Sequence, residues 1–453
     1  MALLSRKKKH PEPQPKRETA SQSVSQETGK TEEPSKPVSV FRGPEKQAVE
    51  KLVALAAKKH AEDAVVDLFT TLAQYAYGLR ASDIHLEPWE AHAKVRLRID
   101  GILHDDFEIP MDIHIQLIAR LKILTAMRTD EHHAPQDGRF KFEAGEESVD
   151  VRASVIPTTL GEKAVLRLLS SQSHKLTLEQ LGLSPEDLAR VQRAIRKPWG
   201  MILATGPTGS GKTTTVYAIL EILNKREVNI STIEDPVEFE IDGVNQSQVD
   251  RVAKLTFATG LRSLLRQDPD VLMVGEIRDQ ETAKIAVNAA MTGHTLLSTL
   301  HTNDSATTIP RLIDMGVETF LVASTLNVAI AQRLVRRVCP DCKGTQTLSK
   351  KEAEKILYPM ALATLFGKNA SIKVAEAKGC VKCNETGYKG RVGLYEVLEN
   401  TEAIQKLIIN RASSSEIKEA ALKEGMTTIE TDAASKITAQ ETTLAEFIRV
   451  MQE

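Results

Sequence analysis

The stretch from Gly200 to Leu223, GMILATGPTGSGKTTTVYAILEIL, constrains the fold of this chain more than any other. It opens with a short apolar run that is typical of a buried strand and closes with an apolar-periodic helix. Between them lies GPTGSGKT, the phosphate-binding pattern GxxxxGK[ST] in the strand–loop–helix setting that it requires. A chance glycine-rich turn is the alternative, and the flanking strand and helix disfavour it. The sequence therefore predicts an α/β protein that binds a nucleotide.

The loop residues have distinct expected tasks in holding ATP and Mg²⁺. Glycines let the backbone turn tightly and direct successive N–H groups at a phosphate. Lys212 is expected to reach the β- and γ-phosphates, and Thr213 to place its hydroxyl on Mg²⁺. The expected nucleotide contacts are Gly206, Pro207, Thr208, Gly209, Ser210, Gly211, Lys212, Thr213 and Thr214.

The 453 residues leave room for two or three domains. Residues 1–46 are polar and predict a disordered tail, whose cluster Arg6–Lys9 either contacts anionic lipid or nucleic acid or is simply solvated. Residues 47–173 predict an N-terminal α+β domain. Its expected helices cover 65–76 and 114–125, and its expected strands cover 82–88, 93–103, 149–155 and 164–169.

Residues 174–337 predict the α/β core, in which apolar strands alternate with helices. Glu234 and Asp235 end one strand, Glu276 follows another, and His294 and His301 flank a third. Ligands of a parallel sheet bind at the carboxyl ends of its strands, so we expect all these side chains at that edge.

These strand-end residues have the chemistry that hydrolysis of ATP needs. We expect Glu276 to be the general base, and Glu234 with Asp235 to hold water and Mg²⁺. His301 and His294 are expected to sense the γ-phosphate. The alternatives are carboxylates that cap the next helix and histidines with only a structural part.

The four cysteines form two CxxC pairs, Cys339 with Cys342 and Cys380 with Cys383, after a helix expected to end at Arg336–Arg337. Four thiolates from two tight turns predict a closed, structural Zn²⁺ site in a module spanning 338–390, with a helical excursion between the pairs. Redox pairs are the alternative, but the expected thioredoxin-like setting is missing. Residues 391–453 predict a helical C-terminal region.

Composition limits the function classes. The net charge of −2 and the aromatic fraction of 4% disfavour a nucleic-acid partner. No stretch reads as a membrane-spanning helix or a secretory signal, so we expect a cytosolic protein that meets a membrane through partners.

The order of motifs SDIHLEP, RIDG, QDGR, GPTGSGKTTT, TIEDPVE, RQDPDVLMVGEIRD, GHTLLSTLHTND and two CxxC pairs resembles the assembly ATPases of type II secretion systems and type IV pili, the GspE/PilB family. The resemblance runs from about residue 60 to the end. It implies a RecA-like ATPase core that forms a homo-hexameric ring at the inner membrane. It also implies that Arg139 and Arg152 of the N-terminal domain stabilise charge at the nucleotide.

The resemblance further implies partners. These are an inner-membrane platform protein (GspF/PilC-like) and a membrane-associated docking protein (GspL/PilM-like), although a short polar tail stands where relatives carry a docking domain. Two other function classes remain as alternatives, a RecA-like motor that translocates nucleic acid and a nucleotide-binding scaffold with little turnover. The residues leave open whether the machine is a secretion, pilus or competence system.

Overall fold

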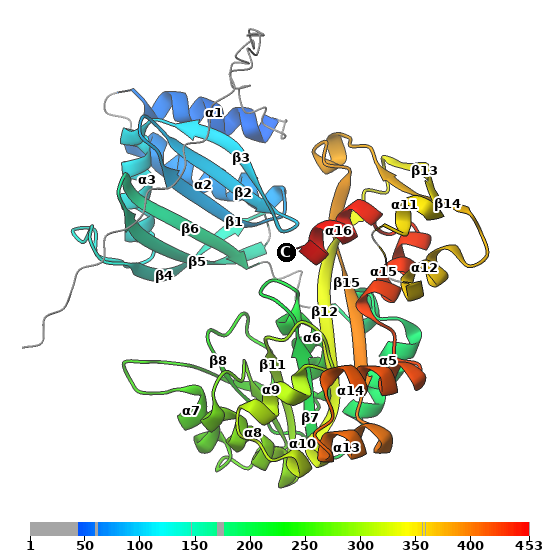
Figure 1. The fold of residues 1–453 in the computed structure, drawn as a ribbon. Helices are drawn as coiled ribbons and strands as arrows, with labels where there is room; N and C mark the ends of the chain where they lie inside the picture. Colours follow the sequence, from blue (N-terminus) through cyan, green and yellow to red (C-terminus); the bar gives the residue numbers. More distant parts are fainter. Residues whose placement is uncertain are drawn as a thin grey trace, which may run out of the picture. The chain divides into compact units, whose positions relative to one another are not determined.

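The computed structural model describes residues 44–452 apart from 59–61, 146, 170–175, 356 and 358 (Figure 1). Of the predicted disordered tail, residues 1–43 lie outside the described residues, and residues 44–46 begin helix α1 (Pro44–Ala56). The predicted boundary at residue 173 also lies outside the described residues.

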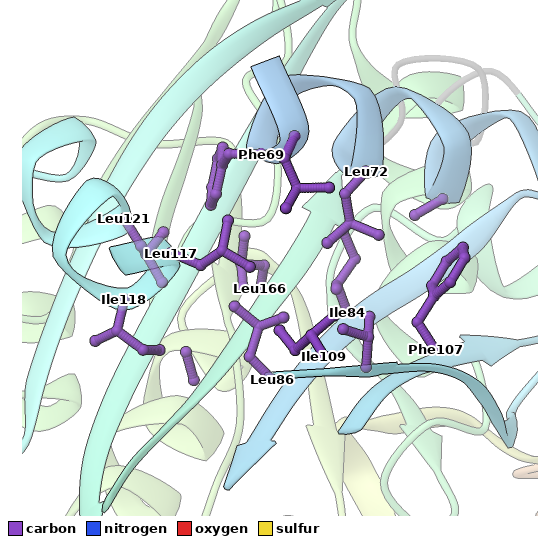
Figure 2. Packing of buried hydrophobic residues seen from close by; sticks show 14 of the residues in the cluster. Phe69, Leu72, Ile84, Leu86, Phe107, Ile109, Leu117, Ile118, Leu121 and Leu166 are labelled. Atoms are coloured by element: carbon purple, nitrogen blue, oxygen red, sulfur yellow. The ribbon is translucent and has the colours of Figure 1, made fainter. Parts of the chain in front are cut away.

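The N-terminal part of the described chain forms an antiparallel sheet of six strands in the order β3-β2-β1-β6-β5-β4. The strands are β1 (Ala81–Pro88), β2 (Ala93–Ile99), β3 (Ile102–Ile109), β4 (Gln136–Ala144), β5 (Glu147–Thr158) and β6 (Gly161–Leu169). Helices α2 (Glu62–Gly78) and α3 (Met111–Leu124) contribute Phe69, Leu72, Leu117 and Leu121 to the core shown in Figure 2. This is the expected α+β arrangement.

Two details of this sheet differ from the sequence-based expectation. The run 93–103 is two strands, because Asp100 and Gly101 take positive φ angles of 49° and 88° and turn the chain between β2 and β3. Strand β4 was not predicted, because its charged residues conceal the alternation of half-buried and exposed side chains.

The central sheet has seven strands in the order β15-β12-β7-β11-β10-β8-β9, and all neighbours are parallel except β12 and β15. The strands are β7 (Gly200–Thr205), β8 (Ile230–Glu234), β9 (Val244–Gln248), β10 (Val271–Val274), β11 (Thr295–Leu300), β12 (Leu326–Val338) and β15 (Tyr388–Glu399). The predicted parallel sheet is therefore present. Each residue of β7 is buried, with Met201 and Leu203 in one core and Ile202 and Ala204 in another.

Helices cover both faces of the central sheet, which is why its inner strands are continuously apolar. One core is shared with α4 (Leu178–Leu181), α5 (Pro185–Ile195) and α6 (Lys212–Leu223). The other is shared with α7 (Phe257–Leu264), α8 (Gln280–Met291), α9 (Thr308–Asp314), α10 (Thr319–Thr325), α13 (Glu402–Ile409) and α14 (Ser414–Lys423).

Strand β12 corrects the expectation of a helix that ends at Arg336–Arg337. Residues 326–338 form one long strand, which pairs with β7 on one side and with β15 on the other. A buried apolar run has no clear periodicity, so its sequence fits either a strand or a helix. The C-terminal region consequently begins inside β15, and its helices start only at Glu402.

The residues between β12 and β15 form a small subdomain that contains both cysteine pairs. The expected helical excursion is instead mixed, with hairpin strands β13 (Lys343–Ser349) and β14 (Ser371–Ala377), helices α11 (Lys350–Ala353) and α12 (Pro359–Phe366), and a 3₁₀ turn at Val381–Cys383. It shares a core with α15 (Ile429–Thr438) and α16 (Leu444–Gln452). Among all described helices, none combines the length and the apolarity needed to cross a lipid bilayer.

Candidate active site

The phosphate-binding loop joins β7 to α6 and depends on glycine at several positions. Gly206, Gly209 and Gly211 have φ angles of 143°, 79° and 88°, a region that favours glycine. A Cβ atom on Gly206 would lie 2.5 Å from the carbonyl oxygen of Gln332. The backbone conformation and the close packing of the loop therefore both require glycine at these positions.

Gln332 on the neighbouring strand β12 holds the loop and was not assigned a function from the sequence. Its Nε2 donates a hydrogen bond of 2.7 Å to the carbonyl oxygen of Ser210. Its side chain is 1% exposed, and a buried amide inside an apolar strand is the signal that points to such a role.

Lys212 begins helix α6 and lies within the loop that it follows. Its ammonium group donates hydrogen bonds of 2.9 Å to the carbonyl oxygens of Gly206 and Pro207. Burial lowers the pKa of Lys212 to about 8, and the negative charge of Glu276 opposes that shift. A triphosphate that reaches the loop would offer this cation stronger acceptors than two neutral carbonyl groups.

A cavity of about 910 Å³ opens at the carboxyl edge of the central sheet. It is lined by Thr208, Gly209, Gly211, Lys212, Thr213, Thr214, Glu234, Asp235, Glu276 and His301, together with residues of other elements. A nucleotide fits a volume of this size. The structure thus brings most of the sequence-predicted site residues to one place.

Glu276 lies two residues beyond β10 and is the acidic group beside Lys212. Its Oε2 atom is 2.5 Å from Nε of Arg278 and 3.5 Å from Nε2 of His301. Burial lowers the pKa of His301, the charges of Lys212 and Arg278 act in the same direction, and Glu276 opposes them. A neutral imidazole beside a carboxylate provides a hydrogen-bonding group near the reacting phosphate.

Glu234, the last residue of β8, is a buried carboxylate at the same edge, with 2% of its surface exposed. Thr232 donates to its Oε1 at 2.6 Å, Gln246 donates to the same oxygen at 3.2 Å, and the Tyr217 hydroxyl donates to its Oε2. Burial raises the pKa of Glu234, and these three donors counteract that rise. Asp235, the next residue, is exposed to the cavity.

The structure does not bring His294 to this site. It precedes β11, whose first residue pairs with Gly200 at the start of β7, whereas the phosphate loop follows the end of β7. A six-residue strand is about 20 Å long. The Nδ1 atom of His294 instead donates to the carbonyl oxygen of Ala289 at 2.9 Å, near the end of α8. The expectation placed both histidines at one edge, but they flank opposite ends of one strand.

The N-terminal sheet supplies two pairs of arginines that differ in their position relative to the cavity, Arg139 with Arg152 and Arg98 with Arg167. Arg139 contacts Oε1 of Gln248 at 2.5 Å, and Arg152 contacts Oε2 of Glu238 at 3.0 Å, so both meet the segment that follows Glu234.

Neither Arg139 nor Arg152 lines the cavity, whereas Arg98 and Arg167 do. These two flank Asp83, at 3.7 and 3.1 Å from its carboxylate oxygens. Both arginines lie in strands expected from the sequence, 93–103 and 164–169, and neither was assigned a function there.

The four cysteines converge as the CxxC spacing predicts. Their sulfur atoms all lie within 4.8 Å of one another, and Cys383 is 3.7 Å from both Cys342 and Cys380. A regular zinc–thiolate tetrahedron with bonds of about 2.3 Å places neighbouring sulfurs about 3.8 Å apart. The backbone N–H groups of Cys380 and Gly387 also donate to Sγ of Cys383, which favours the thiolate that a metal binds. This donor set fits Zn²⁺.

Purified protein should carry about one zinc ion per chain, measured by elemental analysis after gel filtration. Cys383→Ser should lose most of that zinc and unfold at a lower temperature, because the site fastens the two ends of the insertion. Lys382→Ala is the matched control, since that side chain is exposed and forms an ion pair with Asp341. Full activity and thermal stability in protein shown to be zinc-free would contradict the assignment.

Comparisons with known proteins identify the family of this chain. Residues 58–449 match the family described as Type II/IV secretion system protein. The Type IV pilus assembly ATPase PilB of Myxococcus xanthus is 45% identical over 392 residues, which cover 86% of this chain and 68% of that protein. The Type II secretion system protein E of Pseudomonas aeruginosa is 43% identical over 390 residues, which cover 86% of this chain and 76% of that protein.

A solved structure is similar as well. The pilus retraction motor PilT with bound ADP matches with a TM-score of 0.52 and 28% identity, covering 80% of this chain and 95% of that one. Fold and site together define a P-loop protein with a RecA-like core. More narrowly, the chain belongs to the family of type II/IV secretion system proteins.

Proposed function

We propose that this chain hydrolyses ATP as a ring-shaped homo-hexamer and thereby powers assembly of a type IV pilus or a type II secretion pseudopilus. Its enzyme class is that of the P-loop ATPases, as in the PilB relative. The observation that carries the proposal is that one cavity is lined by residues of the phosphate loop together with Glu234, Glu276 and His301.

The proposed reaction uses these residues in order. Lys212 and the loop N–H groups bind the phosphates, and Thr213 with Glu234 and Asp235 would hold Mg²⁺, which screens the phosphate charge when bound. Glu276 accepts the proton of the attacking water, and His301 contacts the γ-phosphate. Product release then changes the relation between subunits of the ring.

We propose that the ring acts at the cytoplasmic face of the inner membrane through a platform protein (GspF/PilC-like) and a docking protein (GspL/PilM-like). The proposed units are a tail 1–46, an N-terminal domain 47–173, an ATPase core 174–337, a zinc module 338–390 and a C-terminal region 391–453. The continuous pairing of β12 with β15 supports treating the last three as parts of one rigid body.

Arg139 and Arg152 are our proposed charge-stabilising residues, and a set of four variants tests them. Arg139→Ala and Arg152→Ala should lower kcat by about tenfold to a hundredfold with little change in ATP affinity, because a transition-state contact is lost. Arg98→Ala and Arg167→Ala, measured in the same phosphate-release assay, are the comparison. A large kcat loss confined to the second pair would transfer the role to the arginines that line the cavity.

The load of the motor is tested by co-purification from the native host with tagged Glu276→Gln protein, which slows cycling. Secretion-system platform and pseudopilin subunits would assign the chain to protein export, and a pilus platform with major pilin would assign it to fibre extension. Bound DNA without either set, and ATPase stimulation by single-stranded DNA, would favour the nucleic-acid motor instead.

A further inference from the structure

We propose that Tyr217 is a positioning residue of the ATPase reaction, which holds the Glu234 carboxylate in one orientation. The proposal rests on the function proposed above, and it concerns a side chain that the phosphate-loop pattern does not include. Tyr217 lies on α6, the helix that begins with Lys212.

The hydroxyl of Tyr217 is the meeting point of three elements. It donates to Oε2 of Glu234 on β8, it accepts the backbone N–H of Glu238 at 3.3 Å, and it lies 3.5 Å from Nε2 of Gln246 on β9. The ring is fixed by its packing, since Tyr217 is 1% exposed and meets Phe239 edge-on with centroids 4.5 Å apart. The position of the hydroxyl is therefore set by the core and not by solvent.

The donors around Glu234 leave little freedom for its carboxylate. A carboxylate offers about four acceptor positions. Among the described residues, Thr232 and Gln246 occupy those of Oε1, and Tyr217 occupies one of Oε2. One acceptor position on Oε2 remains for a group in the cavity that Glu234 lines, such as a water molecule or a metal-bound water.

The test is Tyr217→Phe, which keeps the ring and removes only the hydroxyl. We expect kcat to fall about tenfold to a hundredfold, the range for loss of one hydrogen bond to a charged group, with nearly unchanged KM for ATP. A residue that serves folding alone would not separate kcat from KM in this way. Thr232→Val removes a second donor to Glu234 and should also lower kcat with nearly unchanged KM.

Tyr395→Phe is the matched control, because Tyr395 is equally buried in the same core and its hydroxyl donates to the carbonyl oxygen of Leu181 at 3.5 Å rather than to Glu234. It should leave both kcat and KM for ATP at their wild-type values. Wild-type kcat in both Tyr217→Phe and Thr232→Val would overturn this inference alone. Wild-type protein that hydrolyses no ATP would overturn the proposed function and this inference with it.

Discussion

Glu276→Gln should reduce ATP hydrolysis by about a hundredfold to ten-thousandfold while nucleotide binding persists, because a general base contributes a factor of this size. The amide has nearly the same shape as the carboxylate but cannot accept a proton from water. Multiple-turnover phosphate release measures kcat, and fluorescent ATP binding measures affinity. Loss of the Glu276 charge also removes an acidic partner of Arg278 and His301. Variants of Arg278 and of His301 should therefore be measured in the same assay.

Glu281→Gln is the matched control for this substitution. Glu281 lies on the adjacent helix, is 57% exposed and pairs with Arg262 at 2.7 Å, outside the cavity lining. It should hydrolyse ATP at the wild-type rate. Turnover of Glu276→Gln within a few-fold of wild type would show that another group accepts the proton. Glu234 would then be the next candidate.

Lys212→Ala should weaken ATP binding by about tenfold to a hundredfold and lower kcat at least as much, because charge-assisted hydrogen bonds to the phosphates are lost. The free enzyme should also bind ATP less tightly as the pH rises above 8. The pKa of Lys212 is lowered to about 8 by burial, so the cation that a triphosphate needs becomes scarcer there. Titration calorimetry from pH 7 to 9 measures both effects.

Lys225→Ala provides the control, since Lys225 is exposed just beyond the end of the same helix. Its affinity for ATP should be that of wild type at each pH. Equal affinities of Lys212→Ala and wild-type protein would mean that the nucleotide does not bind through the phosphate loop.

Much of the site was predictable because its polar residues lie at the ends of strands that can be recognised in the sequence. The loop, Glu234 and Glu276 each follow an apolar run directly, and a parallel sheet brings such positions to one edge. The prediction for His294 was wrong because a residue that flanks a strand was assumed to lie at the carboxyl end of that strand. His294 instead precedes β11. The pattern HTLLSTLH spans the whole strand, so its two histidines must separate.

Contacts between distant segments were not predictable from one sequence. Gln332 reaches the phosphate loop from a strand more than a hundred residues later, and Tyr217 reaches Glu234 only because α6 packs over β8. The strand nature of β12 was hidden for a related reason, since its partners β7 and β15 supply the hydrogen bonds that decide between strand and helix.

The cysteine subdomain leaves and rejoins the central sheet at neighbouring points, because Val338 of β12 pairs with Tyr388 of β15. The length of chain between these residues thus has no bearing on the register of the hairpin or on the position of Gln332. The segment between Val338 and Tyr388 is therefore a suitable place to insert a label. A fluorescent or affinity label inserted there would be attached directly to the sheet that holds the phosphate loop.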